Sequence, residues 1–122
     1  MSNRISSWGL ALAVAAAATP VCAQTLSPQD IKDTWVGKTL TGSSNNGVSF
    51  ELKLAADGSS SIVFPNLSDT GTWRLSDDGY CATWKVIRKG AEACFTAVRF
   101  RNGEIKVMGV GGSASGYITK IE

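Results

Sequence analysis

Residues 48–54 read VSFELKL, an unbroken alternation of apolar and polar side chains. Successive side chains of an extended chain point to opposite faces, so the apolar residues of this segment share one face. That face carries Val48, Phe50, Leu52 and Leu54, and the opposite face carries Ser49, Glu51 and Lys53. The pattern predicts a β-strand with one face in a core and the other in water.

Segments of similar character recur on both sides of this strand, and turn residues separate them. Strands are predicted at residues 35–41, 60–64, 70–75, 80–87, 93–101, 104–110 and 117–121. Between them stand turn sequences such as Asp57-Gly58 and Asn102-Gly103, which suit positive φ angles. The connections are too short for the crossovers that parallel strands need, so an antiparallel sheet is predicted.

About eight short strands at this spacing are typical of an all-β sandwich or barrel. Successive hairpins favour an up-and-down, lipocalin-like barrel over a Greek key. A closed barrel of eight strands leaves an interior that side chains fill, or that is just wide enough for one small ligand. A brief helix is predicted before the strands at residues 28–34, with Ser27 as its N-cap and Pro28 in its first turn.

The first 23 residues have the character of a secretion signal. Arg4 precedes an apolar run, and Val21 and Ala23 occupy the small-residue positions before a cleavage site between Ala23 and Gln24. The run is well short of the ~20 residues that span a bilayer, so a membrane anchor is not favoured.

We therefore predict a signal peptide at residues 1–23, a single β-barrel domain at residues 24–122, and a periplasmic or secreted protein. No membrane span is expected after cleavage. Attachment through Cys22, as in a lipoprotein, stays open as an alternative.

Two cysteines remain once the signal is removed, Cys81 and Cys94. An exported protein meets an oxidising compartment, where an even number of cysteines indicates a disulfide. In the chain-entropy model, a disulfide that closes the loop from Cys81 to Cys94 stabilises the fold by ~3 kcal/mol. A redox or metal-binding pair is not favoured, because the thiols are not in CxxC spacing and no second ligand pair is present.

The disulfide raises a question about Arg99. In the strand at residues 80–87, Trp84 and Cys81 fall on opposite faces, and a bridge from Cys81 to Cys94 then places Arg99 on the side of Trp84. Either a β-bulge returns Arg99 to solvent, or Arg99 lines the interior or a barrel mouth. The bulge is favoured, because charged side chains are rarely buried without a partner.

Composition excludes several function classes. The chain of 122 residues contains no histidine, which removes Ser-His-Asp and Cys-His catalytic units and imidazole metal sites. Without Arg4, 11 basic and 10 acidic residues remain, a net charge of +1. This balance gives no strong electrostatic reason to bind nucleic acid or an acidic membrane. We predict a non-enzymatic protein with no cofactor and no metal.

The candidate ligand-binding residues are Trp73, Trp84, Arg99 and Tyr117. They suit a binding module for an unknown small molecule or an envelope component, with the tryptophans in the wall of a pocket. The tryptophans also suit the core of a small barrel, and this core interpretation is favoured for them.

The most distinctive stretch of the chain begins at Gly71. It reads G-x-W-R from Gly71, then C-x-x-W from Cys81, then C-F from Cys94. This pattern resembles a group of small exported proteobacterial proteins of unknown function. The resemblance implies a β architecture and the disulfide, and it implies no activity.

A second similarity lies near the end of the chain. Ser113, Ser115 and Gly116, followed by Tyr117, are similar to the Ser-Ala-Ser-Gly…Tyr loop of the periplasmic inhibitors of C-type lysozyme. Those proteins are small eight-stranded barrels with a disulfide. The resemblance implies an inhibitor that presents the loop of residues 113–116 to an enzyme cleft. The Trp-Lys-Gly segment that follows in that family is not found in this sequence.

Overall fold

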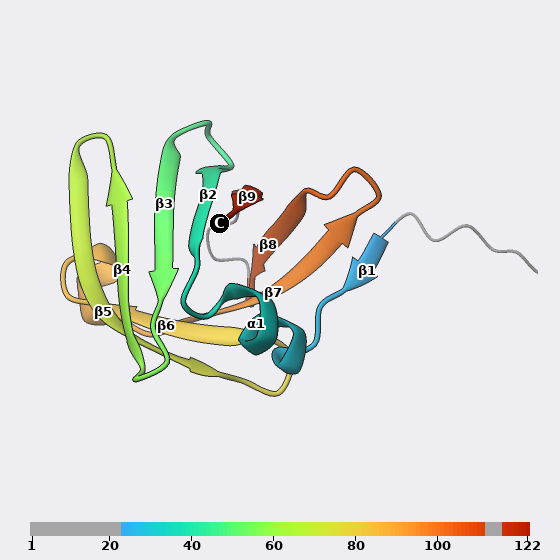
Figure 1. The fold of residues 1–122 in the computed structure, drawn as a ribbon. Coiled ribbons are helices and arrows are strands. Elements are labelled where there is room, and N and C mark those ends of the chain that lie inside the picture. Colours follow the sequence, from blue (N-terminus) through green and yellow to red (C-terminus); the bar gives the residue numbers. More distant parts are fainter. Residues whose placement is uncertain (1–22, 112–115) are drawn as a thin grey trace, which may run out of the picture.

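Strands β2 to β9 close into an eight-stranded antiparallel barrel in the computed structural model, which describes residues 23–111 and 116–122 (Figure 1). The strands are β2 (Thr39–Ser44), β3 (Ser49–Leu54), β4 (Ser59–Phe64), β5 (Leu67–Leu75), β6 (Tyr80–Trp84), β7 (Ala93–Phe100), β8 (Ile105–Gly109) and β9 (Gly116–Ile121). Each strand pairs with the next along the chain, and β9 returns to pair with β2. The predicted all-β, up-and-down fold is confirmed, and it is a barrel rather than a sandwich.

One α-helix, α1 (Pro28–Trp35), precedes the barrel. Ser27 caps it: the Ser27 hydroxyl accepts a hydrogen bond from the Asp30 N–H at 3.0 Å, and the Asp30 carboxylate accepts one from the Ser27 N–H at 2.9 Å. The predicted helix is confirmed and extends one residue further, to Trp35. Trp35 therefore belongs to the helix and not to the predicted strand at residues 35–41.

A short additional strand, β1 (Ala23–Thr25), was not predicted. It pairs with the second half of β7, beyond the point where β6 stops pairing with that strand. The backbone N–H of Leu26 continues this contact by donating to the Ala97 carbonyl at 2.9 Å. Of the predicted signal peptide, residues 1–22 lie outside the described residues. No helix among the described residues is long and apolar enough to cross a membrane.

The core is concentrated where α1 crosses one end of the barrel. Leu26, Ile31 and Trp35 are fully buried there, together with Leu40 and Leu54 from the strands. The Trp35 ring meets the Tyr80 ring edge-on, with centroids 5.6 Å apart. The helix therefore acts as a plug for this end.

The strand boundaries correct two of the predictions, and a bulge decides which residues of β9 face the core. Val48 is 40% exposed, because it precedes β3 in the turn and does not join the core face of Leu52 and Leu54. Residues 85–87 are not part of β6. In β9, the bulge lies opposite Thr41 and Gly42, and Ile118 points into the core.

The bulge expected near Arg99 is absent. The pairs that β7 makes with β6, β1 and β8 run in register from Ala93 to Phe100. Arg99 therefore shares the inner face of Phe95 and Ala97, and the prediction of a solvated Arg99 behind a bulge was wrong. Its side chain is half-buried at the end of the barrel that α1 covers.

Candidate functional site: the open end of the barrel

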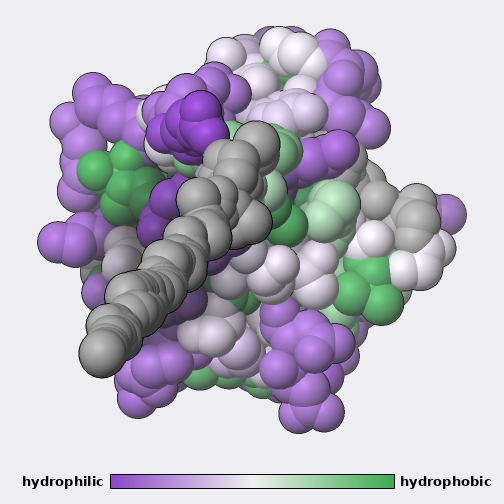
Figure 2. Space-filling view, turned by 90° about the vertical axis from the view of Figure 1, so that its right-hand side faces the viewer, coloured by the Kyte–Doolittle hydropathy of each residue, from purple (hydrophilic) through white to green (hydrophobic). Residues whose placement is uncertain are grey.

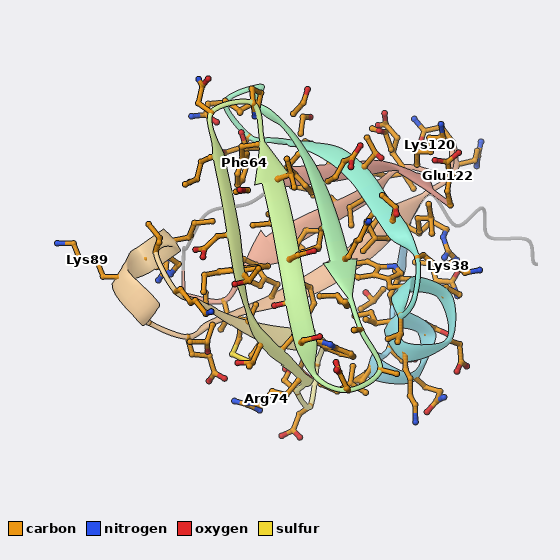
Figure 3. The ribbon with its side chains drawn as sticks, turned by 60° about the vertical axis from the view of Figure 1, so that its left-hand side comes forward. Lys38, Phe64, Arg74, Lys89, Lys120 and Glu122 are labelled. Atoms are coloured by element: carbon orange, nitrogen blue, oxygen red, sulfur yellow. A yellow bond between two sulfur atoms is a disulfide. The ribbon has the colours of Figure 1, made fainter. Side chains whose placement is uncertain are left out.

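An up-and-down barrel places alternate connections at opposite ends. The closed end carries α1 and the connections β3–β4, β5–β6 and β7–β8, and the open end carries the connections β2–β3, β4–β5, β6–β7 and β8–β9. Figure 3 shows Phe64 at the open-end tip of β4. Lys38, Lys120 and Glu122 lie at the right-hand side of the same view. The two ends differ in what fills them.

The open end contains a cavity of about 200 Å³. Its wall is mainly aromatic and aliphatic, and includes Phe50, Ile62, Phe64, Trp84, Phe95 and Ile118. Phe50 packs against Phe64 with ring centroids 5.9 Å apart, and Tyr80 stacks on Phe95 at 5.2 Å. All four rings line the cavity, and such pairs add to the stability of its wall.

The connection between β6 and β7 forms one side of the cavity and has an unusual backbone. Its short helix η1 (Ile87–Gly90) contains Arg88 at φ 57° and Lys89 at φ 55°, both in the left-handed region that L-residues rarely occupy. Such strained residues persist only where surrounding contacts hold them. Ile87 and Arg88 both line the cavity.

Asp69 is the residue that holds this loop. It is 7% exposed, and one carboxylate oxygen accepts hydrogen bonds from the backbone N–H groups of Val86 and Ile87, each at 2.8 Å. The other oxygen accepts from the Thr70 N–H at 2.8 Å. Burial on its own raises the pKa of the Asp69 carboxyl, but these hydrogen bonds outweigh it, so the pKa lies below its ordinary value.

Two contacts on the outward face of the sheet fix the base of the same loop. Cys81 and Cys94 face each other across β6 and β7 and form the predicted disulfide. Beside it, Arg74 donates two hydrogen bonds of 2.9 Å to the Glu92 carboxylate. This pair holds the pKa of Glu92 below its usual range. Cys81, Glu92 and Cys94 lie within reach of a common ion, but the two sulfurs are bonded to each other and are not thiolate ligands.

The motif from Gly71 to Cys94 acquires a structural explanation from these contacts. Arg74, Cys81 and Cys94 are cross-strand neighbours in one row on the outer face. Gly71 is required by close packing, because a Cβ there would collide with the Thr83 carbonyl oxygen. The motif therefore builds the β5–β6–β7 wall that supports the loop.

Of the predicted ligand-binding residues, only Trp84 lines the cavity. The Trp73 indole N–H donates to the Ala55 carbonyl at 2.7 Å, in the β3–β4 connection at the closed end. Tyr117 pairs with Ser43 and Lys106 and is half-buried on the outward face of β9.

Arg99 lies toward α1 rather than toward the cavity. The Ser27 backbone N–H and hydroxyl hold the pKa of Asp30 below its ordinary value, and the charge of Arg99 adds a smaller contribution in the same direction. The structure therefore does not bring the four predicted residues together in one site.

The predicted inhibitory residues Ser113 and Ser115 lie outside the described residues. Gly116 is the first residue of β9 and lines the cavity. A Cβ at Gly116 would stand only 2.6 Å from the Ser43 carbonyl oxygen, so this position needs glycine for close strand packing.

Sequence reasoning missed Asp69 and Arg88, the two polar residues that define this end. In the sequence, Arg88 stands beside Lys89 and Gly90 and has the character of a solvated turn residue. The only available signal was the run Arg88-Lys89-Gly90, whose left-handed geometry is visible only in the structure. Asp69 carried no signal, because its partners Val86 and Ile87 are distant in the chain.

The open end also has an apolar rim. All five exposed large hydrophobic residues of the described chain lie in or beside its four connections; they are Val48, Val63, Leu67, Val86 and Val110. By contrast, the side that carries β1 and β8 shows mainly hydrophilic and neutral residues, with hydrophobic ones in small separate patches (Figure 2). Exposed apolar groups gathered at one place are typical of binding surfaces.

A larger hollow, of about 670 Å³, lies on the outer face of β4, β5 and β6. Hydroxyl side chains such as Ser61, Thr72 and Thr83 line it, with Lys53 and Lys85 at its margins. The hollow is more open to solvent than the cavity at the open end and encloses a small molecule less well. The open-end cavity is the better candidate.

Comparisons of the chain with protein-family models, with curated proteins and with solved structures found no match. The cavity at the open end is therefore the basis for assigning a function.

Proposed function

We propose that this protein is an exported, non-enzymatic binding module that holds one small, mainly apolar molecule in the cavity at the open end of its barrel. The observation that carries the proposal is the cavity wall of Phe50, Ile62, Phe64, Trp84 and Phe95. Burial of an apolar ligand against such a wall is favoured by roughly 25 cal/mol for each Å² removed from water.

The cavity volume limits the ligand. An engineered apolar cavity of about 150 Å³ takes benzene, and pockets for drug-sized molecules hold about 300–1,000 Å³. At about 200 Å³, the site suits a single ring or a short acyl chain. A double-chain lipid or a large cofactor does not fit within it.

The polar groups of the wall support binding rather than catalysis. Ser44 and Tyr80 are the hydroxyl groups among the described lining residues. The Ser44 hydroxyl donates to Asn46 Oδ1 at 2.5 Å, and its hydrogen-bond partners among the described residues include no base. Burial raises the pKa of Tyr80 far above its ordinary value, so the phenol stays protonated and does not act as a base.

A variant with a larger side chain in the cavity wall tests whether the cavity is the binding site. We expect Ala82→Leu, which adds bulk to the cavity wall, to abolish binding of 1-octanol in isothermal titration calorimetry. Ala97→Leu makes the same change at a fully buried site outside the cavity and is expected to keep binding, with circular dichroism confirming that both variants fold. Equal binding by the two variants contradicts the proposal. Native mass spectrometry of the exported, non-reduced protein then identifies any ligand it carries.

The second candidate function is inhibition of a lysozyme-like enzyme through residues 113–116. An eight-stranded barrel with a disulfide is the fold that this resemblance implies. Strand β8 ends and β9 begins at the open end, whose apolar rim suits contact with an enzyme cleft. A lysozyme activity assay with and without Ser115→Ala tests it. Loss of inhibition in the variant supports this function, and no inhibition by the unmodified protein overturns it.

A further inference from the structure

Arg88 stands apart from the rest of the cavity wall. It is the one charged residue among the described residues that line the cavity. Its side chain is exposed, and within the described chain it forms no ion pair. The wall around it is almost entirely apolar, so a bound molecule meets one cation at the edge of a hydrophobic enclosure.

The backbone places Arg88 there at a cost in conformational energy. Left-handed φ angles at two consecutive non-glycine residues are strained, and the loop is held in this state from three sides. Asp69 binds the N–H groups of Val86 and Ile87, directly before Arg88. The disulfide and the Arg74–Glu92 pair fix the base of the loop. These contacts hold the backbone of Arg88 at the edge of the cavity, so its placement there does not depend on a ligand.

We infer that the ligand is a small amphiphile with an anionic end, and that Arg88 binds the anion while the apolar body occupies the cavity. This inference rests on the proposed function. A guanidinium pairs with a carboxylate through two parallel hydrogen bonds, and such charge-assisted bonds are stronger than neutral ones. The exposed position lets an anion reach Arg88 without losing all of its hydration.

Lys89 offers a matched control for Arg88. It has the same charge, nearly the same φ angle and a neighbouring position in the loop. Unlike Arg88, it does not line the cavity. Figure 3 shows Lys89 pointing away from the barrel. A variant at Lys89 therefore changes the local charge equally but leaves the proposed contact intact.

The test compares sodium octanoate with 1-octanol, which have chains of equal length and differ in charge. Isothermal titration calorimetry measures both on the unmodified protein, on Arg88→Gln and on Lys89→Gln. We expect octanoate to bind the unmodified protein about fivefold to tenfold more tightly than octanol. Arg88→Gln is expected to remove this preference, so that octanoate and octanol bind that variant with equal affinity, and Lys89→Gln is expected to keep the preference.

The outcomes separate the inference from the proposed function. If neither compound binds, the container function is wrong and the inference falls with it. If both bind the unmodified protein equally, the container function stands and the anionic ligand class is wrong. If the preference survives in Arg88→Gln, or disappears in Lys89→Gln, the assignment of the anion to Arg88 is overturned. A preference lost only in Arg88→Gln supports it.

Discussion

The two ends of this barrel are stabilised in different ways. At the closed end, Leu26, Ile31 and Trp35 are fully buried, so removal of apolar surface from water holds the chain together. At the open end, the cavity leaves Phe50, Phe64 and Ile87 only partly covered. The open-end loop is fixed instead by Asp69, by a disulfide and by an ion pair. The closed end thus supplies most of the buried core, and the open end contains the cavity.

The difference between the two ends predicts that Trp35→Ala, at the closed end, causes the largest loss of stability. This change removes a fully buried ring beneath the helix, and we expect it to lower the free energy of unfolding by about 3–5 kcal/mol. Phe64→Ala at the half-buried rim is expected to cost less than half of that. Urea unfolding of both variants measures the difference, and equal losses would contradict the division between the two ends.

The disulfide has the next largest expected effect. Replacing both Cys81 and Cys94 by alanine removes the covalent closure of the β6–β7 loop, and we expect a loss of about 3 kcal/mol. Because this loop forms part of the cavity, octanol binding should weaken as well. The measurements are urea unfolding and calorimetry, with Trp35→Phe as a closed-end variant that leaves the loop unchanged. Undiminished stability would show that the Asp69 and Arg74 contacts suffice.

The closed end was largely predictable from local sequence. Ser27, Pro28 and Asp30 carry the start of α1 within four residues, and strict alternation over residues 49–54 matches β3. Turn residues such as Asp57-Gly58 located the hairpins, because the positive φ of Gly58 is a local property. Trp35 was assigned to a strand because β-forming residues follow it, and its burial depends on a contact with Tyr80 that no local pattern reveals.

The open end was not predictable, because its contacts join distant segments. The Asp69 carboxylate meets amides 17 and 18 residues away, and it does so only once β5 and β6 are in register. Strand parity placed Arg99 on the same side as Trp84, which agrees with the structure. The bulge that would have moved Arg99 to the other side is absent from β7, and the bulge that the structure has lies between β2 and β9. Of the four predicted ligand residues, Trp84 reaches the cavity because its inward parity follows from the disulfide register.

A smaller effect is expected at the helix cap. Ser27→Ala removes the hydroxyl that accepts the Asp30 N–H, and we expect a loss of about 1 kcal/mol. Because α1 lies at the closed end, octanol binding by the folded protein should not change. Urea unfolding and calorimetry on the same sample check both statements. Weaker binding in this variant would show that the two ends are coupled.

The smallest effect on global stability, and the most local, is expected when Asp69 is protonated. Its hydrogen bonds keep the pKa of the folded carboxyl below its ordinary value of 3.8. The resulting stabilisation is fully present above that ordinary value and is lost as the pH falls through the lower, folded pKa. Protection of the Val86 and Ile87 amides against hydrogen exchange should fall in that acidic range, while the Leu26 amide, bonded to Ala97 at the closed end, should stay protected.

Asp69→Asn provides the control for this titration, because the amide has nearly the same shape and does not ionise. In that variant we expect the Val86 and Ile87 amides to be poorly protected already at neutral pH, with protection factors that no longer depend on acid. Octanol binding should weaken in parallel, since the same loop supplies Ile87 and Arg88 to the cavity wall. If the loop amides and the Leu26 amide lose protection together, the barrel opens as one unit and its two ends are not independent.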